Sequence, residues 1–316
     1  MRGTSGTRQR AGQPSASAKM LYSVAMGSYF PDSPSQRQGL VAEDAGPVPE
    51  ILPPDSSHIP LPQAVRRPRP MWAVAPATYL LVLINCLVFL VMALKGVSLL
   101  APTSDQLMFF GANHAGLVLI YGEWWRIVTA MFVHVGIIHL ATNMWCLWNL
   151  GLLAEPMLGS AGLLAAYILS GAAGNLLSTC INWLHPIREG AGGTFFPVGA
   201  GASGAVFGIA GVLIILLKSP RLPVPPQELS KLRKSVIYFA AINFIIGIGS
   251  MAPGFGVKID NMAHLGGFIC GLLFAAPLVP RMGSPRRLFL VRRRVAVATV
   301  VAIQVLFGFF LAKLAG

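Results

Sequence analysis

Seven apolar segments of about 20 residues dominate this chain and limit the folds that it can adopt. A segment of this length suits the thickness of a lipid bilayer, where only helices and closed barrels satisfy every backbone hydrogen bond. Hydrophobic residues make up 54% of the sequence and charged residues 11%, whereas soluble domains carry about 25% charged residues. The sequence therefore predicts an all-α, polytopic membrane protein. The predicted spans are residues 75–94, 138–154, 161–183, 202–218, 235–251, 262–280 and 295–315.

Residues 1–70 differ from the rest in composition, being rich in Pro, Ser, Gly and Gln. Such a segment cannot bury enough apolar surface to fold by itself, so we expect a disordered tail. No apolar stretch with a cleavage site follows Met1, which argues against a signal peptide. We divide the chain into this tail, a membrane core at 71–280, and a basic linker with the last span at 281–316. The long connection at 95–137 is expected in the membrane interface.

The basic residues predict the orientation in the membrane. The net charge of +13 comes from residues that cluster beside apolar segments, which argues against a nucleic-acid interface. Alternate connections hold only Lys95, Arg126, Arg188 and Lys258. With seven spans, this asymmetry predicts a cytoplasmic N-terminus and an outer C-terminus. The clusters are Arg66, Arg67 and Arg69; Lys218, Arg221, Lys231, Arg233 and Lys234; and Arg281, Arg286, Arg287, Arg292, Arg293 and Arg294.

The four cysteines lie in apolar segments and form no CxxC pair. We interpret Cys86, Cys146, Cys180 and Cys270 as small core residues rather than disulfide partners or metal ligands. No H-E-x-x-H motif is present. The sequence therefore predicts neither a metal nor another cofactor.

The glycine-rich stretch at 199–208 contains a serine where an apolar helix is expected to begin. Gly201 and Gly204 flank Ser203 closely and permit a sharp turn. A serine at such a turn exposes its hydroxyl beside backbone N–H groups that can hold an oxyanion. Small residues in membrane helices also serve simply as packing surfaces, and this alternative stays open for the stretch taken alone.

A histidine begins the sixth predicted span. His264 is followed by Gly267 and Gly271 at one-turn spacing, which forms a smooth groove for the helix that begins at Ser203. His264 is a candidate general base for the Ser203 hydroxyl. The alternative is a histidine at a helix end that faces water. The predicted orientation starts both helices on the outer side, at similar depth.

Polar residues also mark the second predicted span. His139 and Asn143 are four residues apart and share a helix face, so both can point toward one spot and supply oxyanion donors. Hydrogen bonding between helices is the alternative. His134 and His139 are five apart and diverge by about 140° on a regular helix, which disfavours a metal site.

No carboxylate falls inside a predicted span, so a Ser-His-Asp triad lacks an obvious third member. Asp260 lies one turn before His264 and either caps the helix or orients the imidazole. We favour a helix cap and hence a Ser-His dyad. The absence of paired carboxylates within the spans also argues against an aspartyl-type membrane protease.

Several motifs together resemble those of the rhomboid family of intramembrane serine proteases. Gly201-Ala-Ser203-Gly204 resembles the family's GxSG, and Ala263-His264 with Gly267 and Gly271 resembles its AHxxGxxxG. The resemblance covers about residues 71–316. Further matches are the histidine-and-asparagine pattern of His134, His139 and Asn143, the first-loop motif Glu123-Trp-Trp125-Arg126, Glu155-Pro-Met-Leu-Gly159 and Tyr167-Ile-Leu-Ser-Gly171-Ala-Ala-Gly174.

The resemblance implies a six-helix core plus a seventh, C-terminal helix. It implies Ser203 as nucleophile, His264 as base, and His139 and Asn143 as oxyanion partners. Phe207 occupies the place where the family has an aromatic residue against the catalytic histidine.

Further expectations follow from the same resemblance. Trp125 and Arg126 would be structural, and the substrates would be membrane proteins with helix-destabilising residues near the cut. A mobile gate is expected at the fifth helix and the loop 249–256. We favour a bacterial plasma membrane as the location. The alternatives are an inactive rhomboid-like protein that binds membrane clients, and a small transporter, which the missing internal repeat disfavours.

Overall fold

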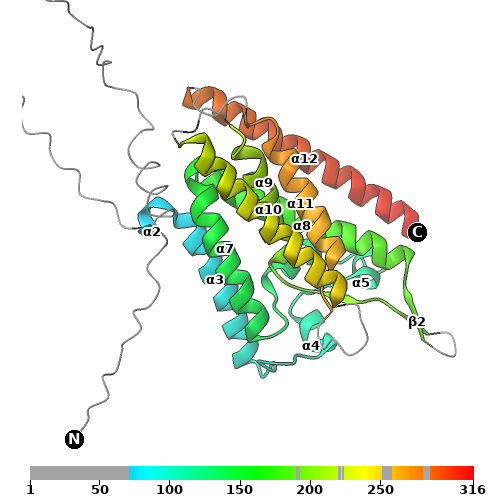
Figure 1. The fold of residues 1–316 in the computed structure, drawn as a ribbon. Helices are drawn as coiled ribbons and strands as arrows, with labels where there is room; N and C mark the ends of the chain where they lie inside the picture. The colour runs from blue at the N-terminus through cyan, green and yellow to red at the C-terminus, as the bar shows by residue number, and fades with distance from the viewer. Residues whose placement is uncertain (1–70, 190–192, 220–221, 223, 251–257, 280–284) are drawn as a thin grey trace, which may run out of the picture.

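The computed structural model describes residues 71–189, 193–219, 222, 224–250, 258–279 and 285–316. The tail at 1–70, Arg221, Arg281 and most of the loop 249–256 lie outside these ranges. Within them, seven apolar helices overlap the seven predicted spans, which confirms a helical, polytopic membrane protein (Figure 1). Five are long enough to cross a bilayer: α3 (Pro76–Leu94), α7 (Ile137–Leu158), α8 (Ser160–Leu184), α10 (Pro226–Gly249) and α12 (Arg286–Ala315). Two are shorter: α9 (Ser203–Leu216) and α11 (Asn261–Ala275).

Two helices begin about nine residues earlier than the apolar pattern indicates. The fifth starts at Pro226 instead of residue 235, and the seventh at Arg286 instead of residue 295. Hydropathy marks only the part of a helix that contacts lipid, whereas Lys, Arg, Glu and Leu continue a helix readily into water. The arginines placed in a basic linker at 281–294 therefore lie, from Arg286 onward, on α12 itself.

The connection at 95–137 is folded rather than irregular. It contains α4 (Ser104–Phe109). A capping box between Thr103 and Gln106 stabilises the N-terminus of this helix. The short elements that follow are β1 (Asn113–His114), α5 (Ala115–Leu119), α6 (Arg126–Thr129) and η2 (Ala130–Phe132). The four-residue helix α2 (Met71–Val74) precedes α3.

Two small antiparallel strand pairs lie in the loops. β2 (Ile187–Glu189) and β3 (Gly193–Phe195) form a hairpin after α8. β4 (Val198–Gly199) pairs with β1, with Asn113 opposite Gly199. This second pair fixes the segment that leads to Ser203 against the folded connection.

Helix α9 is the centre of the molecule. All of its residues except Ser203, Ile214 and Ile215 are buried, among α7, α8, α10 and α11 (Figure 1). It has 14 residues and is therefore about 21 Å long, shorter than the hydrocarbon core of about 30 Å. A helix enclosed by protein need not reach both membrane surfaces, so one of its ends lies below the level that a full span would reach.

A buried carboxylate joins α7 to the start of α3. Glu155 is 1% exposed and accepts hydrogen bonds from the backbone N–H groups of Ala77 and Thr78 at 2.9 and 2.8 Å. The hydroxyls of Thr78 and Ser160 donate to it as well. We expected Glu155 at the end of a shorter second span, but α7 continues to Leu158 and includes it. Four donors satisfy this charge, and two of them are orphan N–H groups of the α3 N-terminus.

Candidate active site

Ser203 is the first residue of α9 and is half-buried. In the preceding turn, the Gly201 N–H donates a hydrogen bond to the Ala130 carbonyl at 2.9 Å. The φ of Gly201 is +133°, a backbone conformation that glycine adopts much more readily than other residues. No side chain caps this helix. The N–H groups of Ser203, Gly204 and Ala205 precede the first intrahelical bond, so they form a concentration of positive partial charge beside the Ser203 hydroxyl.

The His264 ring lies beside the first turn of α9. It is buried and stacks on Phe207, with ring centroids 4.1 Å apart and 12° between the ring planes. Phe207 is four residues after Ser203 and therefore on the same face of α9. Among the described residues, Nδ1 of His264 is buried without a hydrogen-bond partner.

Glycines bring the two helices into backbone contact. A Cβ built on Gly267 would collide with the Gly204 carbonyl, and one on Gly271 with the Gly208 carbonyl. Because contact residues advance in the same direction on both helices, α9 and α11 run parallel. Ser203, the first residue of α9, and His264, in the first turn of α11, consequently lie at the same end of the molecule, as the sequence predicts.

Asp260 caps α11. One carboxylate oxygen accepts the Ala263 N–H at 2.9 Å, and the other accepts the Ser178 hydroxyl at 2.5 Å. Burial raises the pKa of the Asp260 carboxyl above its usual range. The carboxylate makes no bond to His264, so the described residues contain a serine and a histidine without a third member that orients the imidazole.

His139 and Asn143 lie on one face of the first turns of α7. The His139 ring faces the Ser203 loop, because a Cβ built on Gly201 would lie 2.6 Å from His139 Cε1. His139 Nδ1 accepts the Val135 N–H at 3.4 Å, which leaves the proton on Nε2 for donation. Asn143 is buried and donates to the His139 carbonyl at 2.9 Å.

The structure changes the interpretation of His134. We placed His134 and His139 on one regular helix, but α7 begins at Ile137, and Gly136 has a φ of +101°. The centroids of the two rings are only 5.4 Å apart. The angle of about 140° expected between residues five apart on one helix therefore does not describe this pair. Among the described residues, no group of three His, Cys, Asp or Glu side chains is arranged to hold a metal ion.

His134 connects the folded connection to the serine loop, a role that sequence spacing did not indicate. Its Nε2 accepts the Ala202 N–H at 3.4 Å, so Nδ1 carries the proton and donates to the Phe132 carbonyl at 3.2 Å. Burial, together with the nearby His139, lowers the pKa of His134 to about 3. The ring is therefore neutral, as this pair of bonds requires.

Glu123, Trp125 and Arg126 lie apart from this cluster. The Arg126 guanidinium donates to the Met108 and Ala112 carbonyls and pairs with Glu123, and it lies 4.5 Å from the Trp125 ring centroid. These bonds hold the start of α6 against the end of α4 and the segment that leads to β1. This segment reaches the serine loop through the pairing of β1 with β4 and through the Ala130 carbonyl, which accepts the Gly201 N–H.

The comparisons with known proteins agree with this architecture. Residues 121–281 match the family described as the Rhomboid domain. That range includes every candidate site residue and covers half of the chain. The chain belongs to the rhomboid family. It is therefore an integral membrane protein.

Bacterial and plant proteins are among the relatives of this rhomboid chain. It is 34% identical to Rhomboid protease GluP of Bacillus subtilis over 210 residues, which are 66% of this chain and 36% of GluP. It is 32% identical to Rhomboid protease AarA of Providencia stuartii over 204 residues, 63% of this chain and 70% of AarA. RHOMBOID-like protein 1 of Arabidopsis thaliana is 33% identical over 175 residues, 55% of this chain and 40% of that protein. The chain thus spans well under two thirds of GluP and of the plant relative.

Proposed function

We propose that this rhomboid protein is an intramembrane serine endopeptidase that cleaves transmembrane segments of other membrane proteins near the outer face. One observation carries the proposal. A buried histidine, stacked on Phe207, lies at the first turn of the helix that Ser203 begins. Two relatives, GluP and AarA, are named rhomboid proteases, which supports a protease activity for this chain.

The proposed mechanism uses Ser203 and His264 as a dyad. His264 takes the hydroxyl proton as Ser203 attacks the scissile carbonyl, and it then returns the proton to the leaving amine. The N–H of Ser203, with His139 and Asn143, stabilises the oxyanion. Water hydrolyses the acyl-enzyme in the second half of the reaction, again with His264 as base.

A substrate helix must unwind before this attack, because helical hydrogen bonding hides its carbonyl groups. We therefore expect substrates with small or helix-destabilising residues near the cut. Access would be gated by α10, which lies on the outside of α9 and has only Leu229, Val236, Ala240 and Gly247 buried. The rest of this expected gate, the loop up to residue 256, lies outside the described residues.

The proposed location is a bacterial plasma membrane, with the N-terminus in the cytoplasm and the C-terminus outside. The basic residues on the first turns of α10 and α12 support this orientation, since both ends would then face the cytoplasm. Attaching a reporter after Gly316 and testing its accessibility in intact cells checks the prediction. A cytoplasmic reporter would contradict it.

The activity is tested by cleavage of a transmembrane substrate in liposomes. Ser203→Ala and His264→Ala should each lower the cleavage rate by about 10⁴-fold or more. Matched controls are Ser235→Ala on α10 and His185→Ala at the end of α8, which should retain the wild-type rate. Cleavage by folded Ser203→Ala would overturn the proposal. Folded protein that binds membrane clients but never cleaves them would instead favour a client-binding rhomboid-like protein.

A further inference from the structure

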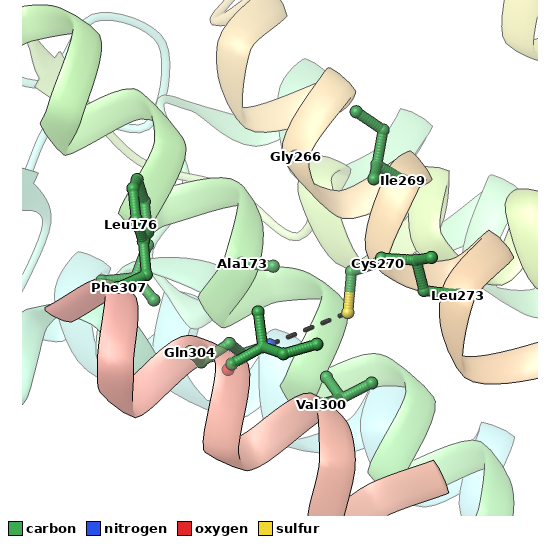
Figure 2. A pocket seen from close by; sticks show the side chains of 10 residues that line it. Ala173, Leu176, Gly266, Ile269, Cys270, Leu273, Val300, Gln304 and Phe307 are labelled. Atoms are coloured by element: carbon green, nitrogen blue, oxygen red, sulfur yellow. Dashed lines mark hydrogen bonds between the residues drawn. The ribbon is translucent and has the colours of Figure 1, made fainter.

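A cavity lies beside the seventh helix, where this helix packs on the core. It has a volume of about 140 Å³ and lies among α8, α11 and α12 (Figure 2). Its walls are apolar side chains with one glutamine, which Figure 2 shows between Val300 and Phe307 on α12. The side-chain amide of Gln304 donates hydrogen bonds to the Leu169 carbonyl at 2.8 Å and to Cys270 Sγ at 3.7 Å. The cavity is therefore an apolar space beside the apolar part of α12.

The cavity opens sideways, toward the surface that contacts lipid. Ile269, Leu273 and Ile303 line it and are 43%, 55% and 51% exposed. A cavity of about 150 Å³ with aliphatic and aromatic walls stays dry and holds a molecule the size of benzene. The space thus suits about six carbons of an acyl chain. A transmembrane helix is about 10 Å wide and does not fit.

Five arginines lie on the first turns of the same helix. Among the described residues the only ion pairs are Arg126 with Glu123 and Lys231 with Glu228, so none of the five has an acidic partner there. Arg293 donates to the Leu158 carbonyl at 2.8 Å, and the other four are exposed. The five are Arg286, Arg287, Arg292, Arg293 and Arg294.

One arginine is aligned with the open rim of the cavity. Arg292 precedes Ile303 by 11 residues, so the two lie within about 20° of the same helix face and about 16 Å apart along the axis. Arg293 is aligned in the same way with Gln304. The distance from a lipid phosphate to the bilayer midplane is about 20 Å. A lipid whose phosphate contacts Arg292 therefore brings its acyl chain to the cavity.

We propose that the groove between α11 and α12 is a binding site for one anionic phospholipid. Arg292 and Arg293 bind the phosphate headgroup, and one acyl chain occupies the cavity beside Cys270 and Gln304. Charge complementarity selects the anionic lipid, because unpaired arginines at the membrane surface attract phosphate without a competing carboxylate. The acyl chain fills the local gap that remains between α12 and the core.

The test uses phosphatidylglycerol that carries a diazirine in the middle of its acyl chain. The full-length protein is reconstituted in phosphatidylcholine vesicles with a trace of this probe, irradiated and digested. Adducts should concentrate in the peptides with residues 266–273 and 300–307, about fivefold above the exposed face of α10 around Ile242 and Ile245. Unlabelled phosphatidylglycerol should compete, and phosphatidylcholine should not.

Variants test the headgroup and the cavity separately. Arg292→Ala should lower the cavity adducts about fivefold, and the double change with Arg293→Ala about 30-fold. Arg287→Ala, on the opposite side of α12, should change them by less than about twofold. Ile303→Trp should close the rim and lower the adducts, whereas Val301→Trp, a matched change 160° away, should not.

Three results would overturn the proposal. The first is an even spread of adducts over all exposed helices. The second is an equal loss in Arg287→Ala and Arg292→Ala, which would indicate general charge attraction. The third is equal labelling from a diazirine phosphatidylcholine, which would exclude selection by headgroup.

Discussion

Helices α11 and α12 both pack against the core, but they do so in opposite ways. α11 meets α9 through glycines whose backbones touch, so no space remains between the two helices. α12 meets the core through a few apolar side chains, among them the buried Val300 and Leu311, and through long polar side chains that reach across. Arg293 and Gln304 donate hydrogen bonds to core carbonyls, and a cavity remains beside Gln304. In Figure 1, α12 runs along the outer edge of the bundle, and α9 lies inside it.

This difference follows from the physics of packing in lipid. Apolar side chains gain little by leaving lipid for protein, so close packing depends on small residues and on polar contacts between helices. Close contact fixes a geometry to within tenths of an ångström, which the proposed dyad of Ser203 and His264 would require. A side-chain contact tolerates movement, and it leaves room for a lipid. The α9–α11 pair therefore suits chemistry, whereas α12 suits adjustment to the membrane.

The largest predicted effect comes from adding one methyl group at the α9–α11 contact. Gly271→Ala should lower the free energy of unfolding by about 3 kcal/mol or more, because the new Cβ meets the Gly208 carbonyl. Gly308→Ala on α12 is the matched control. Its Cβ makes an ordinary 3.6 Å contact with Trp124, so it should be neutral or stabilising by under about 1 kcal/mol. SDS unfolding in mixed micelles measures both, and equal stabilities would contradict the comparison.

A buried carboxylate should matter more than an exposed one. Glu155→Gln places an amide N–H₂ among four donors and should lower the free energy of unfolding by about 2–3 kcal/mol. Glu228→Gln on α10 removes an exposed ion pair with Lys231 and should cost under about 1 kcal/mol. The same unfolding measurement applies. Wild-type stability of Glu155→Gln would show that this cluster does not hold α3 to α7.

The ring stack at the site should affect the reaction more than the fold. Phe207→Leu removes the ring that supports His264 and should lower kcat about tenfold, with little change in KM. Phe310→Leu, at an exposed position of α12, should leave kcat unchanged. Steady-state cleavage of one transmembrane substrate measures both variants. An unchanged kcat in Phe207→Leu would mean that the stack does not position the base.

The smallest predicted effect concerns the α12 contact. Gln304→Leu removes the hydrogen bond to the Leu169 carbonyl and should lower the free energy of unfolding by about 0.6 kcal/mol. Thr299→Val, an exposed change of similar size, should have no measurable effect. A loss above about 2 kcal/mol for Gln304→Leu would place α12 with the tightly packed core rather than with the adjustable periphery.

Local patterns predicted much of this fold and cluster. Apolar length located all seven helices, and the spacing of Gly267 and Gly271 indicated the close backbone contact between α9 and α11. Those patterns reflect constraints that act within one helix or between two helices. They are therefore visible in a short stretch of sequence.

The features that were missed depend on residues far apart in the chain. His134 contacts the Ala202 N–H across 68 positions, and Glu155 contacts the start of α3 across 77 and 78 positions. The sequence around a histidine outside a helix, or around a carboxylate at a helix end, does not indicate which distant residue it contacts. Helix starts were also misplaced at Pro226 and Arg286, because apolar length indicates lipid contact rather than hydrogen bonding.

One measurement tests the account most directly. Purified protein is treated with a fluorophosphonate, which reacts with activated serines, and the adduct is mapped by mass spectrometry. We predict a single adduct on Ser203 that disappears in Ser203→Ala, falls by at least about 100-fold in His264→Ala, and persists in His185→Ala. An adduct on another serine, or full labelling of Ser203 in folded His264→Ala, would contradict the proposed dyad.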